Sequence, residues 1–268
     1  MNPRHHLGFT LIELSIVLVI IGLVIGGALV GKDLIKAAEI RSMIVELESY
    51  KTSINAFRLK YNAYPGDMSN ATEIWGTAPS CKWGETTDGT TCNGNGDGII
   101  GATTNAENMN GDYTVEYTRF WQHLSNSKLI PGNYTGSSAD YSNYYGAAEP
   151  GINMPVLKNN ACVSAFRWPS SPYPLYASFY PGEYKFIFYV GLPLAGDVCY
   201  SPAFTPTEVF SIDTKIDDGL PGTGNLRPLT PNWASTADCA TTSDPSTARY
   251  KTSSSSINCN ILFIRIAP

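Results

Sequence analysis

The most regular hydrophobic pattern in this 268-residue chain lies at its N-terminal end. An apolar run extends from Phe9 to about Val30 and contains a single charged residue, Glu13. Because roughly 20 helical residues cross the ~30 Å hydrocarbon core of a bilayer, the run predicts a membrane-spanning helix. A cleavable secretory signal has its small-residue cleavage site after the apolar core, whereas Gly8 precedes this one. We therefore expect the apolar run to be retained.

An amphipathic pattern follows the apolar run. The segment from Lys32 to Tyr61 lacks Pro and Gly, and its apolar residues recur at the spacing of a helix that covers a core. These residues are Ile40, Met43, Ile44, Leu47, Ile54, Phe57 and Leu59. We predict one helix from Phe9 to about Tyr61, roughly 80 Å long, ended by the turn Tyr64-Pro65-Gly66-Asp67. The chain then divides into a leader (1–8), a membrane half of the helix (9–31), an amphipathic half (32–63) and a globular head (64–268).

Glycines interrupt the membrane half at Gly22, Gly26, Gly27 and Gly31. One interpretation is close packing of helices through small residues. The other is that the glycines lower the helix propensity by about 1 kcal/mol each and let the segment stretch during assembly. The two interpretations are compatible.

The head is rich in Gly, Ser, Thr, Asn and Pro, which predicts short elements joined by long loops. Aromatic and β-branched residues predict strands at 184–190, 163–168 and 261–266. Helices are predicted at 69–75 and 114–127, and a third begins at a capping box, Thr205-Pro206-Thr207-Glu208, and extends to about Asp217. The expected fold class is α+β, with the long helix packed on a small antiparallel sheet.

Glu13 is the unusual residue of the membrane half. A carboxylate costs roughly 2.5–3.5 kcal/mol at the bilayer centre, and no cation follows within helical reach. If the leader were removed between Gly8 and Phe9, the new α-amino group would lie at the start of the helix. That group could pair with Glu13 of a neighbouring copy, so an assembly would satisfy a carboxylate that a single chain leaves exposed.

The residues around Glu13 carry a family resemblance. Positions 8–14 read Gly-Phe-Thr-Leu-Ile-Glu-Leu ahead of an apolar helix, which resembles the class III signal of type IV pilins and of type II secretion pseudopilins. The resemblance implies a pilin-like fold, cleavage after Gly8 by a prepilin peptidase and N-methylation of Phe9. It further implies polymerisation with other pilin-like subunits through Phe9 and Glu13 on an inner-membrane assembly platform. The precursor would be a single-pass protein of the bacterial inner membrane, with its head in the periplasm or in an extracellular filament.

Charge and histidine content argue against two other classes of protein. The formal net charge of -5 does not suit phosphate binding, so no nucleic-acid partner is expected. His123 is the one histidine outside the leader, and it lies in a predicted helix without a nucleophile signature such as Gly-x-Ser-x-Gly. We expect a structural histidine and no enzyme.

Six cysteines in an exported head predict disulfides, and six allow fifteen pairings. Their order favours the local pairs Cys81-Cys92, Cys162-Cys199 and Cys239-Cys259. A disulfide that closes a ~15-residue loop contributes about 3 kcal/mol to stability, so three local bridges could stabilise a head with little regular structure. A zinc site at Cys81 and Cys92 is disfavoured because no CxxC occurs. The pair Cys239-Cys259 also resembles the C-terminal disulfide-bounded loop of pilins.

A first calcium site is suggested by the segment from Asn93 to Ile99. Side-chain oxygens of Asn93, Asn95 and Asp97 alternate with glycines as in an EF-hand loop, and Ile99 can offer its carbonyl. The twelfth position is Thr104 where an EF-hand has Glu, although Glu107 can replace it from a differently shaped loop. A Gly/Asn turn without an ion is an equal alternative.

A second acidic segment runs from Ile212 to Gly219. Asp213 and Asp217 lie four residues apart on a predicted helix and therefore face the same way. They either coordinate calcium or form a solvated face, and the base rate of unliganded surface acids favours the solvated face. This segment also resembles one found in large pilin-like proteins.

The function predicted from these features is a structural subunit of a type IV pilus or type II secretion pseudopilus. The alternative is a minor pilin-like adhesin or binding module, displayed on such a filament. Tyr141, Tyr144 and Tyr145 lie in a Ser/Asn-rich loop and would suit a contact surface.

Overall fold

A computed structural model describes residues 10–78, 89–101, 116–136, 148–157, 159–167, 180, 185–194, 198–229, 238–264 and 266. In these ranges the element order is α1 (Leu11–Tyr61), α2 (Ala71–Trp75), α3 (Glu116–Asn126), β1 (Cys162–Arg167), β2 (Phe186–Gly191), α4 (Pro206–Ile216), β3 (Leu226–Leu229) and β4 (Asn260–Ile264). The fold is α+β and pilin-like, as predicted. Residues 1–42 and 43–268 form two compact units, which are described separately.

The long N-terminal helix is present as α1 and ends at Tyr61. Asn62 adopts φ 51°, in the left-handed region that commonly ends helices, and the Pro65-Gly66 turn follows. Between residues 10 and 42 no described side chain is buried. Burial in α1 begins at Met43, so the first unit has no core of its own.

The prediction for the buried face of α1 is wrong at Leu59, which is 89% exposed. Phe57 is fully buried, and a residue two positions further along a helix points to nearly the opposite side. Tyr50 and Ser53, which the apolar pattern did not include, complete the buried face. The Ser53 hydroxyl donates to the Leu129 carbonyl at 2.9 Å, and this bond permits burial of a polar side chain.

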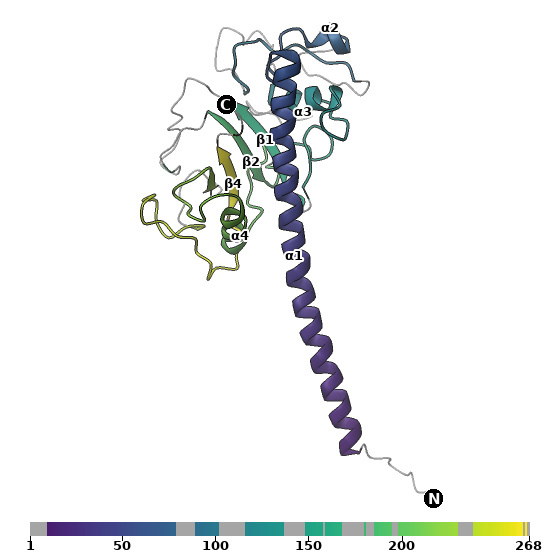
Figure 1. The fold of residues 1–268 in the computed structure, drawn as a ribbon, viewed down its shortest axis with the longest axis vertical. Coiled ribbons are helices and arrows are strands. Elements are labelled where there is room, and N and C mark those ends of the chain that lie inside the picture. Colours follow the sequence, from purple (N-terminus) through teal and green to yellow (C-terminus); the bar gives the residue numbers. More distant parts are fainter. Residues whose placement is uncertain are drawn as a thin grey trace, which may run out of the picture. The chain divides into compact units, whose positions relative to one another are not determined.

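The sheet of the second unit has four antiparallel strands in the order β1-β2-β4-β3. Figure 1 labels β1, β2 and β4, which lie side by side. Phe188 in β2 pairs with Ala165 on one side and with Phe263 on the other. The predicted strands β1, β2 and β4 are present, but β3 was not predicted. It contains Pro228, which cannot donate to a ladder and is tolerated here because β3 is an edge strand.

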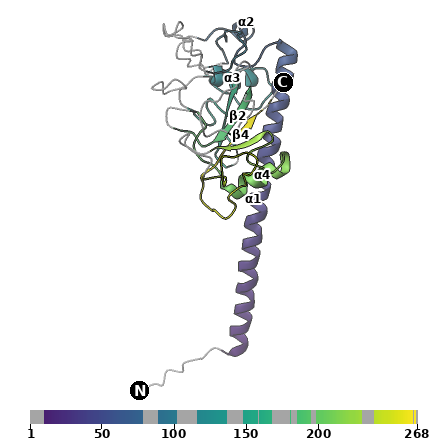
Figure 2. The same ribbon diagram turned by 90° about the vertical axis from the view of Figure 1, so that its left-hand side faces the viewer.

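The helix α3 packs between the second half of α1 and the sheet. The Trp121 ring lies 5.0 Å from that of Tyr50 in α1 and 5.9 Å from that of Phe188 in β2. Phe120 meets Phe186 edge to face at 6.1 Å. Figures 1 and 2 show α2 and α3 toward one end of this unit and α4 toward the other. Aromatic packing therefore joins the second half of α1 to the sheet.

Disulfides connect the loops of the second unit to the sheet. Cys162 at the start of β1 is bonded to Cys199, and Cys239 is bonded to Cys259 beside β4, which are the pairings that the order of the cysteines favoured. Cys92 is also disulfide-bonded. Its predicted partner, Cys81, lies outside the described residues.

Candidate functional site

The start of α1 is capped by its own side chains. The Glu13 carboxylate accepts hydrogen bonds from the backbone N–H and the hydroxyl of Thr10, both at 2.9 Å. The Glu13 N–H donates back to the Thr10 hydroxyl at 3.3 Å, which completes a capping box. Sequence reasoning overlooked this Thr-x-x-Glu signal. Glu13 thus has partners within a single chain, while Gly8 and Phe9 lie outside the described residues.

The segment that follows Glu13 presents apolar side chains that are exposed in the part of the chain that the structure describes. An 18-residue window in α1 has a mean hydropathy of 2.7, and none of that window is buried. A Cβ added at Gly22, Gly26, Gly27 or Gly31 would meet nothing within 4 Å. The helix is long and apolar enough to span a membrane.

A second candidate site lies in the head, where three carboxylates converge from separate segments. One oxygen from each of Asp67, Asp97 and Glu116 lies within 4.8 Å of the other two. Asp67 lies in the turn after α1, Asp97 belongs to the Gly/Asn-rich loop, and Glu116 is the first residue of α3. Asp67 and Glu116 are buried, whereas Asp97 is exposed. The cluster therefore has two buried acids and one acid at the surface.

Backbone hydrogen bonds hold these segments together. The Asp67 Oδ2 atom accepts from the Gly98 N–H at 3.0 Å, and its carbonyl accepts from the Gly96 N–H at 3.0 Å. The Glu116 Oε1 atom accepts from the Asn95 N–H at 3.2 Å. A side chain at Gly94 would overlap the backbone of Asp67, so this close approach requires glycine.

Burial and mutual repulsion perturb two of the three acids. Burial, reinforced by the charges of Asp67 and Asp97, raises the pKa of Glu116 to about 9. Burial also raises the pKa of Asp67 to about 6, and the Gly98 N–H opposes that shift. None of the three carboxylates forms an ion pair with a basic residue of the described ranges. The nearby Arg167 donates to the Gly98 carbonyl and lies 4.0 Å from the centre of the Tyr64 ring.

The predicted EF-hand-like ligands are only partly placed at this cluster. Asp97 belongs to it, but the Asn93 side chain accepts from the Thr72 N–H in α2, and Ile99 donates its N–H to Asp97. Glu107 lies outside the described residues. Sequence reasoning missed Asp67 and Glu116 because it assigned the Tyr64–Asp67 turn only the role of ending α1.

The second acidic segment builds a turn after α4. The Asp213 carboxylate accepts from the Gly219 N–H at 3.1 Å and the Tyr250 hydroxyl at 2.6 Å. Asp217 accepts from the N–H groups of Asn225 and Leu226, and Asp218 accepts from the Leu220 N–H and the Thr223 hydroxyl. The three acids converge, but most of their oxygens already have donors within the chain.

The predicted solvated face is wrong for Asp213, which is fully buried. Burial raises the pKa of Asp213 to about 7, while the Tyr250 hydroxyl opposes the shift. Calcium binding by Asp213 and Asp217 stays a prediction.

His123 is a buried structural residue at the centre of the head. Its Nδ1 accepts from the Gly66 N–H at 2.9 Å, and its Nε2 lies 3.1 Å from the Thr91 hydroxyl and 3.3 Å from the Cys92 carbonyl. These contacts use both ring nitrogens. The histidine therefore fixes the Gly66 turn, which precedes Asp67.

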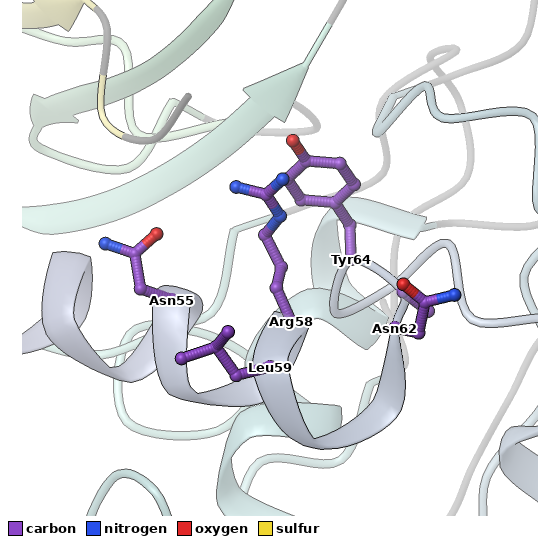
Figure 3. A pocket seen from close by; sticks show the side chains of 6 residues that line it. Asn55, Arg58, Leu59, Asn62 and Tyr64 are labelled. Carbon is purple, nitrogen blue, oxygen red and sulfur yellow. The ribbon is translucent and has the colours of Figure 1, made fainter.

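A surface pocket lies where α1 ends (Figure 3). Asn55, Arg58, Leu59, Asn62, Ala63 and Tyr64 line it. The Arg58 guanidinium carbon lies 4.5 Å from the centre of the Tyr64 ring, so a cation–π contact forms one wall. The pocket contains none of the residues predicted to be functional.

Comparison with known proteins identifies the N-terminal segment. Residues 3–29 match a family model described as the prokaryotic N-terminal methylation motif, a range that includes Gly8, Phe9 and Glu13. No curated protein and no solved structure matches this chain. The motif defines a structural rather than a catalytic family, and with the apolar helix it fits a membrane-anchored precursor. It therefore indicates a type IV pilin-like or pseudopilin precursor, with the class III signal of pilins at the head of a long apolar helix.

Proposed function

We propose that this chain is a structural subunit of a type IV pilus or a type II secretion pseudopilus, and that it polymerises through α1. The observation that carries the proposal is the methylation motif at residues 3–29, which includes the start of an apolar helix whose most apolar window is unburied in the described structure. A lipid bilayer covers such a helix in the precursor. Copies of the same helix would cover it in a filament.

Processing would prepare the chain for that exchange. Cleavage between Gly8 and Phe9 by a prepilin peptidase removes the leader and exposes the α-amino group of Phe9, which is then methylated. The amine remains cationic after methylation. It stands next to Thr10, whose N–H and hydroxyl hold the Glu13 carboxylate in the single chain.

Glu13 can exchange this local cap for a partner in a neighbouring subunit. The capping box lowers the cost of inserting a carboxylate in the precursor, because the acid accepts two hydrogen bonds at the positive end of the helix dipole. A charged amine from the neighbour would be a stronger partner in an apolar environment. In the filament, the amino terminus of one helix would therefore lie at the level of Glu13 in the neighbouring helix.

The four glycines support packing of neighbouring helices. The space beside each is open in the single chain, and small residues let helix backbones approach closely in a membrane. Prepilin peptidase, other pilin-like subunits and an inner-membrane assembly platform are the partners that this proposal requires.

The proposal is tested by replacing Glu13 in the full chain, expressed with its assembly machinery. We expect Glu13→Ala to insert into the membrane normally but to enter filaments about tenfold less, since a charge-assisted hydrogen bond contributes about 1.5–3 kcal/mol. Membrane fractions and sheared or cross-linked filaments are compared by immunoblot. Ser15→Ala is the matched control, because Ser15 is polar and exposed in the same segment and bonds only to the Ile12 carbonyl. Normal incorporation of Glu13→Ala would refute the assembly role of Glu13.

A further inference from the structure

We propose that Asp67, Asp97 and Glu116 form a binding site for a divalent hard cation, Ca²⁺, in the head. The three oxygens that converge there come from segments far apart in the sequence. The site shares only Asp97 with the ligand set suggested by the loop pattern. It does not depend on the polymerising role proposed for α1.

Charge balance is the first argument for a cation. Three carboxylates lie together, and two of them are buried at 4% and 0% exposure. Within the described residues no basic side chain forms an ion pair with any of them, and the guanidinium of Arg167 is directed to the Gly98 carbonyl and the Tyr64 ring. Adjacent carboxylates repel one another, and burial strengthens that repulsion. A bound cation would remove it.

Unsatisfied oxygens are the second and independent argument. Asp67 Oδ1 and Glu116 Oε2 are buried and have no hydrogen-bond partner, although the other oxygen of each carboxyl accepts a backbone N–H. A buried polar atom without a partner typically costs about 1–3 kcal/mol. Protonation of one acid would cancel only its own charge and would leave the remaining carboxylates of the cluster without a counter-ion. A metal ion bound at the cluster would give both buried carboxyl groups a positively charged partner.

The donor atoms favour calcium over other metals. All three side chains offer oxygen, and the one nearby histidine, His123, has both ring nitrogens engaged. Because Ca–O distances are about 2.3–2.6 Å, two oxygens on one Ca²⁺ lie up to roughly 5 Å apart, which accommodates the observed clustering within 4.8 Å. Magnesium demands shorter distances and near-ideal octahedral geometry. Carbonyls of the Gly-rich loop and water can complete a calcium shell.

Bound calcium would join three segments. Asp67 lies in the turn after α1, Asp97 lies on the loop, and Glu116 begins α3. Hydrogen bonds already place the loop against both buried acids. We therefore infer that the ion stabilises the loop and the start of α3.

The test is calcium binding by the purified full chain in detergent after treatment with EGTA. Calorimetric titration with CaCl₂ should show binding, and a hundredfold excess over the dissociation constant should raise Tm by about 5–10 °C. Glu116→Gln keeps the shape of the side chain but removes its charge. It should weaken calcium binding at least tenfold and abolish the Tm shift, and without calcium it should melt no lower than the wild type, because the amide replaces a buried acid that binds calcium only after it has lost its proton.

Glu48→Gln is the matched control, since Glu48 is an exposed acid outside both acidic groups and its carboxylate pairs with Lys51. It should bind calcium like the wild type. Three results would overturn the proposal: no calcium binding at millimolar concentration, binding unaffected by both Glu116→Gln and Asp67→Asn, or an equal response to MgCl₂. Filament assembly does not enter these measurements, so they do not depend on the outcome of the Glu13 experiment.

Discussion

His123 must stay neutral for the head to keep its internal hydrogen bonds. Nδ1 accepts from Gly66, so the ring hydrogen is on Nε2, which faces the Thr91 hydroxyl. Thr91 in turn donates to the Gln122 side chain at 2.7 Å, so its oxygen is available to accept from His123. Burial, with a smaller effect of the Arg119 charge, lowers the pKa of His123 to about 3. A second proton would remove the acceptor for Gly66.

Acid should therefore destabilise the head through His123. Below about pH 6.5, His123 binds a proton in the unfolded chain, whereas in the folded chain it stays neutral down to about pH 3. The contribution of His123 to the free energy of unfolding therefore falls as pH falls through this window. His123 alone contributes a slope that approaches 1.4 kcal/mol per pH unit, while the raised pKa values of Asp67 and Asp213 contribute slopes of the opposite sign in part of the same window. Urea unfolding at several pH values between 7 and 4, compared with a variant that lacks His123, measures the contribution of His123.

The matched variant is His123→Gln, which cannot titrate in this window. It should be less stable at pH 7 by about 1–3 kcal/mol because a buried hydrogen-bonded group is changed. Between the wild type and this variant, the slope of the free energy of unfolding against pH should differ by the contribution of one proton. Parallel pH profiles for the two proteins would show that His123 is not the group responsible.

The residues of the acidic cluster show where local sequence reasoning ends. Asp97 was predicted as a ligand because alternating Asn, Asp and Gly is a pattern within a few residues. Asp67 and Glu116 were not predicted as ligands, because their hydrogen bonds to the loop join residues that lie 31 and 21 positions apart in the sequence. Local patterns predict turns and helix faces, but they do not show which distant carboxylates share a buried space. Gly66 and Gly94 permit the close approach of these segments, and their role is visible only in the folded chain.

Helix α4 was predictable because its start signal is complete within four residues. The Thr205 hydroxyl accepts from the Glu208 N–H at 3.3 Å, and the Glu208 carboxylate accepts from the Thr205 N–H at 2.7 Å. Strand β3 carries no comparable signal, because its four residues include Arg227 and Pro228. Pairing with β4 and the bonds that Asp217 accepts from Asn225 and Leu226 determine where β3 begins.

Removing the cap of α4 should therefore cost measurable stability. Thr205→Ala is expected to lower the free energy of unfolding of the head by about 1 kcal/mol, as the Glu208 N–H loses its acceptor. Thr214→Ala in the same helix is the matched control, since the Thr214 hydroxyl is exposed and bonds only to carbonyls of the preceding turn. Denaturant unfolding compares the two variants. Equal effects of both substitutions would argue against a capping role for Thr205.

At the scale of the whole molecule, two compact units differ in where their stability comes from. The unit of residues 43–268 buries aromatic side chains between α1, α3 and the sheet. The unit of residues 1–42 has no buried side chain among its described residues. Its helix therefore depends on lipid or on neighbouring subunits, since helices in water gain most of their stability from tertiary packing.

This difference predicts a pattern of amide hydrogen exchange along α1. In the full chain bound to detergent, amides between Met43 and Phe57 should be well protected, because that part of the helix packs on α3. Amides between Lys32 and Ser42 lie beyond the most apolar stretch, carry exposed side chains and should exchange at least about tenfold faster. In assembled filaments the same amides should become protected if neighbouring helices cover them, while those between Met43 and Phe57 serve as the internal reference. Equal protection of residues 32–42 before and after assembly would contradict packing of this segment in the filament.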